Sequence, residues 1–186
     1  MKIYYCDGST RGGKNQKGAD NIGGWGAVCF IDADENRICA CEYDTEKNTT
    51  NNRQELKGLL YCLEHADEFY PDEECVIYSD STYVVNMFND WIHSWARNNW
   101  KNSKKQTVEN LDLVLEVWEH VKQDFYHCQV RKTDGHSGII GNELVDALAT
   151  ASMNKFNTII EEYAIAIDWQ ELDSFECTQF LRKEIY

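Results

Sequence analysis

Apolar and polar positions in the first part of the chain predict three strands. Apolar runs at 2–7 (KIYYCD), 25–32 (WGAVCFID) and 37–43 (RICACEY) are typical of strands. The first run ends at an aspartate and is followed by a polar, glycine-rich stretch over 8–24, which predicts a loop. Polar residues 32–36 predict a hairpin turn between the second and third strands.

The remaining pattern predicts helices alternating with two further strands. Leucines recur at helical spacing from Asn52 to Phe69, which predicts a long amphipathic helix. We expect strands at 75–80 and 125–132 and helices at 81–95 and 142–154. Another helix is predicted between them, with one apolar face formed by Leu111, Val114, Leu115, Trp118 and Val121. The order β-β-β-α-β-α-α-β-α predicts an α/β fold whose five-stranded mixed sheet has three antiparallel strands first, then parallel strands, and flanking helices.

Length and hydropathy favour one core domain. At 186 residues the chain is long enough to bury one core, and we expect a domain over 1–156 and a C-terminal extension over 157–186 to which the pattern assigns no role. No run of 18 apolar residues predicts a membrane span. The start of the chain lacks the long apolar region of a signal peptide, so we expect a cytoplasmic protein.

Charge and cysteine spacing limit the kinds of partner. A net charge of −14 argues against a protein that binds nucleic acid over its whole surface. Residues 93–105 are the exception, because they carry Arg97, Lys101, Lys104 and Lys105 and no acid. The eight cysteines are scattered, and the only close pair, Cys39 and Cys41, has no partner pair of zinc-finger spacing. The spacing therefore predicts neither a zinc site nor a disulfide framework.

Four acids stand out by their positions. Asp7 and Asp80 each end a predicted strand, Glu55 begins the long helix and Asp146 lies in the last helix. If the two strands are neighbours, the four side chains converge at one end of the sheet, where α/β folds commonly bind ligands. Like charges that close require a cation, and Mg²⁺ binds carboxylates together with substrate phosphate. The arrangement suggests phosphodiester hydrolysis assisted by two metal ions.

Each of these acids also has a structural interpretation. Asn52 and Glu55 have the spacing of a capping box, and Asp80 precedes a helix as an N-cap residue does. Asp7 precedes a glycine as turn residues do, while Asp146 fits a surface position. His136, between glycines in a predicted loop, fits either a mobile proton carrier or ordinary polar surface.

Five motifs together resemble type 1 ribonuclease H. They contain YCDGS with Asp7, TNNRQEL with Glu55, YSDSTYV with Asp80, GHSGIIGNELVDALA with His136 and Asp146, and WIHSWARNNWKNSKKQTVENLDL (91–113), which is similar to the basic handle of bacterial members. The similarity runs from Lys2 to Met153 in the family's order. It implies a ribonuclease H-like fold and an endonuclease that hydrolyses the RNA strand of RNA–DNA hybrids, leaving 5′-phosphate and 3′-hydroxyl ends.

The resemblance also implies roles for individual residues. Asp7, Glu55, Asp80 and Asp146 would bind two Mg²⁺ ions, with Mn²⁺ as a possible substitute, and His136 would assist proton transfer or product release. The hybrid would contact the first loop, the start of the long helix, the next helix and the handle. The corresponding residues are Gly8, Ser9, Gly12, Thr50, Asn51, Asn52, Thr82, Trp91, Trp95, Arg97, Trp100, Lys101, Lys104 and Lys105.

Departures from the family pattern concern substrate affinity more than chemistry. The loop after Gly12 is longer than usual, Thr82 stands where glutamine is common, and Ala96 and Asn98 stand where the handle usually has basic residues. Fewer phosphate contacts lower affinity and flatten its salt dependence. The alternatives are a related metal-dependent nuclease of other substrate, a non-catalytic hybrid-binding module, and an acidic interaction protein. We expect a monomer that acts on hybrid nucleic acid and contacts no membrane.

Overall fold

A computed structural model describes residues 1–11, 21–31, 38–122, 126–136 and 138–153. It contains one five-stranded sheet, in the order β3-β2-β1-β4-β5. The strands are β1 (Lys2–Thr10), β2 (Ile22–Phe30), β3 (Ile38–Lys47), β4 (Cys75–Ser79) and β5 (Cys128–Lys132). Pairing is antiparallel between β1 and β2 and between β2 and β3, and parallel between β1 and β4 and between β4 and β5. The predicted mixed sheet is thus confirmed.

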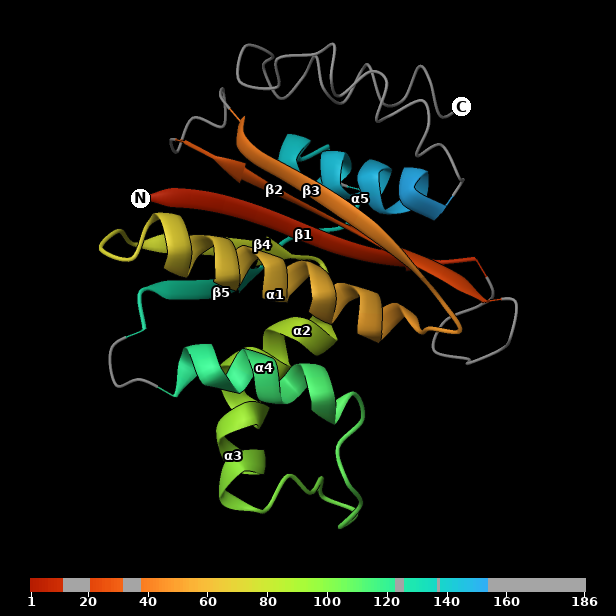
Figure 1. The fold of residues 1–186 in the computed structure, drawn as a ribbon, viewed down its shortest axis with the longest axis vertical. Helices are drawn as coiled ribbons and strands as arrows, with labels where there is room; N and C mark the ends of the chain where they lie inside the picture. The colour runs from red at the N-terminus through yellow and green to blue at the C-terminus, as the bar shows by residue number, and fades with distance from the viewer. Residues whose placement is uncertain (12–20, 32–37, 123–125, 137, 154–186) are drawn as a thin grey trace.

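Helices cover both faces of this sheet (Figure 1). They are α1 (Asn51–Phe69), α2 (Thr82–Asn86), the π-helical segment η1 (Met87–Trp91), α3 (Ile92–Arg97), α4 (Leu111–Val121) and α5 (Ile140–Met153). Because side chains alternate along a strand, Tyr4 and Cys6 of β1 join the core cluster beneath α1 and α4. Ile3 and Tyr5 pack with α5 on the opposite face. The helix α3 and the segment after it project furthest from the sheet (Figure 1).

The first strand is longer than its apolar pattern suggests. Pairing with β2 continues through Thr10, which lies opposite Gly23. Asp7 therefore lies inside β1, and the predictions that it ends the strand and that Gly8 and Ser9 belong to a loop were wrong. Backbone hydrogen bonds to β2 hold this polar segment extended, a tertiary effect that local polarity does not reveal. The predicted turn at 32–36 lies outside the described residues.

Two helix starts differ from the predicted ones. Thr50 caps α1, since its hydroxyl oxygen accepts a hydrogen bond from the backbone N–H of Arg53. The predicted capping box of Asn52 and Glu55 is therefore wrong. Ser81 rather than Asp80 caps α2 by accepting from the N–H of Val84. Neither carboxylate is needed as a helix cap, so both can act elsewhere.

The helix expected over 81–95 is divided, and the helix after it presents a different face. A π-helical turn over Met87–Trp91 separates α2 from α3 and shifts the later side chains around the axis. In α4, the buried residues are Leu113, Val114, Val117 and Val121, whereas Leu115 of the predicted face is exposed.

Among the described residues, no helix has the length and apolar character needed to span a bilayer.

Candidate active site

The sheet places Asp7 and Asp80 side by side. The parallel pairing of β1 with β4 runs to the pair Tyr5 and Tyr78. Asp7 lies two residues after Tyr5, and Asp80 lies two residues after Tyr78. The two aspartates therefore occupy equivalent positions where the two strands part. Asp7 is only 7% exposed, which rules out the interpretation of a solvated turn residue.

The start of α1 brings Glu55 to the same place. Gly8 makes this possible because a Cβ at that position would overlap the backbone nitrogen of Glu55, so only glycine lets β1 and α1 approach this closely. The Glu55 side chain is buried and held at both oxygens. Its Oε1 accepts from Asn51 Nδ2 at 2.6 Å, and its Oε2 accepts from Ser81 Oγ at 2.5 Å.

Helix α5 and the loop before it complete the cluster. Asp146 is the seventh residue of α5, and its Oδ2 lies 3.8 Å from Nδ1 of His136. The His136 side chain is 81% exposed and its backbone has a left-handed φ of 51°. The neighbouring Gly135 lies against Asp80, since a Cβ there would be 2.6 Å from Oδ2 of Asp80. The loop therefore lies over the carboxylates.

The charge of the cluster acts on its most buried member. Burial raises the pKa of Asp7 well above its ordinary value, and the negative charges of Asp80, Asp146 and, to a smaller extent, Glu55 raise it further. The hydrogen bond from the Gly8 N–H, at 2.7 Å, opposes this rise. The other three acids therefore lie close enough to act on Asp7. The donor set consists of carboxylate oxygens, which fits Mg²⁺ or Mn²⁺.

Known proteins resemble this chain in sequence. The ribonuclease H family model matches residues 1–154. The chain belongs to the ribonuclease H family. Ribonuclease H of Francisella tularensis subsp. novicida is 34% identical over 151 residues, which cover 81% of this chain and 90% of that protein. Ribonuclease H of Ehrlichia ruminantium is 35% identical over 153 residues, covering 82% and 94%. The family assignment makes this chain a nuclease.

Solved structures share the ribonuclease H fold. LC9-RNase H1, described as a type 1 RNase H with the type 2 active-site motif, has a TM-score of 0.65 at 24% identity and covers 93% of this chain and 86% of its own. A foamy viral protease-reverse transcriptase in complex with RNA/DNA hybrid has a TM-score of 0.70 at 19% identity, covering 82% of this chain and 20% of its own.

The residues expected to contact the hybrid have varied surroundings in this ribonuclease H. Thr50 is buried as the cap of α1, and the Asn51 amide donates to Glu55. Asn52 is half-buried, while Thr82 is exposed at the first residue of α2. Gly8 and Ser9 lie in β1, and Gly12 lies outside the described residues. Gly8 and Asn51 thus organise the carboxylates directly, whatever their contacts with substrate.

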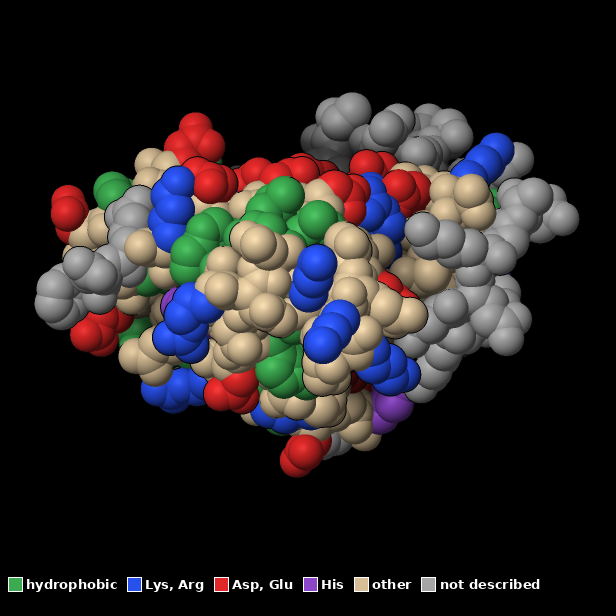
Figure 2. All heavy atoms as spheres, turned by 90° about the horizontal axis from the view of Figure 1, so that it is seen from below, with side chains coloured by type: hydrophobic (Ala, Val, Ile, Leu, Met, Phe, Trp, Pro, Cys, Tyr) green, Lys and Arg blue, Asp and Glu red, His purple; other side chains and the backbone are tan. Residues whose placement is uncertain are grey.

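The handle (residues 91–113) is an ordered projection. Asn102 Oδ1 accepts from the backbone N–H groups of Lys104 and Gln106, and a bridge joins Lys101 to Thr107. All four cations are exposed, namely Arg97, Lys101, Lys104 and Lys105. Figure 2 views the molecule from this side and shows Lys and Arg side chains among polar ones, with acids mostly at the periphery.

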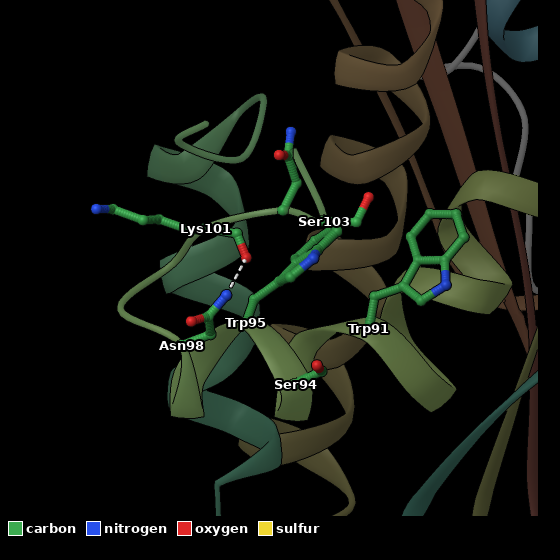
Figure 3. Close-up of a pocket in the computed structure, with 7 residues that line it drawn as sticks. Trp91, Ser94, Trp95, Asn98, Lys101 and Ser103 are labelled. Atoms are coloured by element: carbon green, nitrogen blue, oxygen red, sulfur yellow. Dashed lines mark hydrogen bonds between the residues drawn. The ribbon is translucent and has the colours of Figure 1, made fainter. Parts of the chain in front are cut away.

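The handle tryptophans differ in their exposure. Trp91 is 37% exposed, whereas Trp95 and Trp100 are half-buried, and Trp100 packs edge-on against Trp118 of α4. Trp91 and Trp95 line a pocket of about 510 Å³ with Ser94, Asn98 and Lys101. Figure 3 shows Trp95 within it, the hydrogen bond from the Asn98 amide to the Lys101 carbonyl, and the Lys101 side chain extending away.

The sequence pattern missed two residues of the site. Ser81 both caps α2 and donates to Glu55. Lys132 of β5 lies opposite Ser79 in the sheet, and its Nζ donates to the backbone carbonyls of Asp80 and Thr133. A hydroxyl directly after Asp80 at a helix start is a signal for Ser81, but the Lys132 contact depends on strand register, which the sequence does not specify.

Proposed function

We propose that this ribonuclease H is a type 1 enzyme that cuts the RNA strand of RNA–DNA hybrids internally and leaves 5′-phosphate and 3′-hydroxyl ends. The observation that carries the proposal is the convergence of three further carboxylates, those of Glu55, Asp80 and Asp146, on the buried Asp7. Such a cluster is costly in the absence of a cation and suited to phosphodiester hydrolysis with one present. The hybrid bound to a fold neighbour, the foamy viral enzyme, supports the substrate class.

Asp7, Glu55, Asp80 and Asp146 are the proposed ligands of two Mg²⁺ ions, with Mn²⁺ as a substitute. When bound, the ions supply positive charge that activates water and stabilises the leaving oxygen. The chain's own contribution is positioning. Asn51 and Ser81 fix both oxygens of Glu55, and Gly8 keeps Asp7 and Glu55 together. This preorganisation reduces the rearrangement needed during the reaction.

His136 is the proposed proton carrier. Its exposed ring lies near the Asp146 carboxylate, and a histidine exchanges protons readily near neutral pH. The position allows the ring to accept or release a proton at Nδ1 or Nε2 and to contact a product phosphate. Gly135 and Gly138 flank it, which suits a loop that adjusts to substrate.

Hybrid binding is proposed to use two regions, the residues around the carboxylates and the handle. One group of residues would contact the minor groove, where 2′-hydroxyls distinguish RNA from DNA. It consists of Thr50, Asn51 and Asn52 at the start of α1, Gly8 and Ser9 in β1, Gly12, and Thr82. The handle would contact backbone phosphates through its four cations, with Trp91, Trp95 and Trp100 shaping its surface. The first region would thus recognise RNA, whereas the handle would attract any nucleic acid through its phosphates.

We further propose that the enzyme is a cytoplasmic monomer. The net charge of −14 favours dispersed molecules through mutual repulsion. No disulfide joins the seven described cysteines to one another, as expected in a reducing compartment. The catalytic domain is assigned to 1–156, and 157–186, outside the described residues, to an extension of unknown role.

Substrate identity is tested with end-labelled nucleic acids and Mg²⁺. The substrates are an RNA–DNA hybrid, the same RNA alone, duplex RNA and duplex DNA. We expect internal cuts confined to the RNA of the hybrid and abolished by EDTA. Retention of an intact hybrid would favour a binding module, whereas cutting of duplex DNA would indicate a nuclease of other substrate.

A further inference from the structure

A second group of ligand side chains lies at the opposite end of the sheet from the carboxylates. Cys75 begins β4 and Cys128 begins β5, and the two residues are partners in the parallel pairing. The Cys75 N–H donates to the carbonyl of His127 at 3.0 Å. Asp80 follows Cys75 by five residues, which corresponds to about 16 Å along an extended strand. This group is therefore separate from the candidate active site.

The three side chains are close enough to share one ion. The sulfurs of Cys75 and Cys128 and a ring nitrogen of His127 all lie within 4.8 Å of one another. Two sulfurs on one tetrahedral Zn²⁺ are about 3.8 Å apart when each bond is about 2.3 Å. Small side-chain movements would therefore close the group around a cation. Thiolate and imidazole ligands favour Zn²⁺ over the oxygen-seeking Mg²⁺ of the other site.

The surroundings of His127 also suit a metal ligand. The imidazole is only 19% exposed, and its Nε2 is buried and makes no hydrogen bond within the described part of the chain. The Asp67 carboxylate lies 3.7 Å from that nitrogen and is itself held by Tyr126 and His120. With Nδ1 as the ligand atom, Nε2 carries its proton beside this carboxylate, and such an outer partner orients a ligating ring and increases its basicity.

The two thiols already interact. A hydrogen bond between the sulfurs lowers the pKa of Cys75, while the same contact and burial raise the pKa of Cys128. Binding of a cation would release the protons of both thiols to solvent and leave both sulfurs as thiolates.

We propose that Cys75, His127 and Cys128 bind one Zn²⁺ ion and so fasten β4 to β5. Three protein ligands leave the fourth tetrahedral position to water. The ion stabilises the edge of the sheet and takes no part in hybrid cleavage. Cysteine spacing alone does not reveal this site, because Cys75 lies more than 50 residues from its two partners.

Cobalt substitution tests the proposal on the full, reduced chain. We expect one equivalent of Co²⁺ to produce thiolate-to-cobalt charge-transfer absorption and tetrahedral d–d bands, and Zn²⁺ to displace it. Cys75→Ala and Cys128→Ala should remove the charge-transfer band. His127→Gln should weaken binding by more than the roughly tenfold loss that follows removal of an outer partner. It should leave the hybrid cleavage rate unchanged.

Matched variants distinguish an ion at these three residues from cobalt bound at another thiol or at the carboxylates. Cys62→Ala removes a buried thiol elsewhere, in α1, and should keep the spectrum; Asp80→Asn should also keep it. Circular dichroism of each variant verifies folding, and the partly exposed His127 supplies a substitution outside the deepest core. Absence of charge transfer in the wild-type chain, or equal affinity in wild type and His127→Gln, would overturn the proposal.

Discussion

At the scale of single residues, Asp7 is a charged group kept where burial and like charges disfavour it. Its pKa is raised, so the native state binds its proton more tightly than the unfolded chain does. The protonated form therefore stabilises the metal-free protein at low pH, and this contribution is lost as the pH rises through the raised native pKa. The charged form of Asp7, which would bind a metal ion, is therefore the form that destabilises the metal-free protein.

Replacement of Asp7 by a neutral isostere should expose that opposition. We expect Asp7→Asn to raise the Tm of the metal-free chain near neutral pH, by about 2–4 °C for each kcal/mol of relieved repulsion. The Tm of the wild type should fall more steeply with rising pH than that of the variant. Melting curves in EDTA across the pH range measure both effects. A variant with a lower Tm at every pH would contradict the proposed repulsion.

Ser81 should matter for both stability and rate. Ser81→Ala removes the cap of α2, which costs about 0.5–2 kcal/mol, and one hydrogen bond to Glu55. We expect a lower urea midpoint together with slower hybrid cleavage, per folded molecule, at saturating Mg²⁺. Glu64→Ala, at an exposed position of α1 outside the handle and the carboxylate cluster, is the control and should change neither. Ser81→Thr should restore the cleavage rate; failure of that rescue would argue against a role for the hydroxyl.

The candidate site residues could be selected from the sequence because their motifs are local. Asp7, Glu55, Asp80, His136 and Asp146 each lie in a short recognisable stretch, and the structure brings them together. The residues that hold these side chains or their backbone in place are less predictable. Lys132 reaches the Asp80 carbonyl only through the β4–β5 register, and Thr50 caps α1 because backbone geometry, rather than residue type alone, selects the capping side chain.

At the scale of elements, the close approach of β1 to α1 sets the geometry of the cluster. Gly8 is where the two elements meet. The sequence predicted both elements but not their contact, which depends on tertiary packing. The same dependence on tertiary packing explains why the buried face of α4 was predicted only in part, since its apolar residues permit two faces. It also explains why one helix was expected over 81–95, where the π-helical turn at Met87–Trp91 shifts the later side chains around the axis.

A methyl group at Gly8 should separate these elements. Gly8→Ala would force Cβ against the backbone of Glu55, and overpacking of this kind costs about 1–3 kcal/mol. We expect a lower free energy of unfolding and weaker Mg²⁺ activation of cleavage. Gly58→Ala, in the middle of α1, is the matched control because its nearest contact would be a milder 3.2 Å. Equal effects of the two substitutions would show that Gly8 does not set the distance between β1 and α1.

At the scale of the whole molecule, an acidic body carries one exposed basic projection (Figure 2). The net charge of −14 repels nucleic acid, so in the proposed function the handle cations orient the hybrid toward the carboxylates. The distribution of charge along the sequence predicted this asymmetry, and the fold shows that the handle projects from the sheet (Figure 1).

Removal of handle charge should weaken binding in a salt-dependent way. Replacing Lys101, Lys104 and Lys105 by alanine should lower hybrid affinity and reduce the slope of log K against log salt by up to about 0.9 for each phosphate that the handle no longer neutralises. Fluorescence anisotropy at several salt concentrations measures the slope. Lys122→Ala, at an exposed lysine after α4, should leave it unchanged. An unaltered slope in the triple variant would place the phosphate-binding cations elsewhere.

The most direct measurement compares Asp7→Asn with wild type on an end-labelled RNA–DNA hybrid, under single-turnover conditions with Mg²⁺. Binding of the same hybrid is measured in parallel, and Asp72→Asn, at an exposed acid in the turn after α1, is the matched control. We expect Asp7→Asn to lose cleavage while it remains folded and binds the hybrid, whereas Asp72→Asn should cleave as wild type does. Wild-type cleavage by Asp7→Asn, or undiminished cleavage in EDTA, would contradict the assignment of the reaction to the carboxylate cluster.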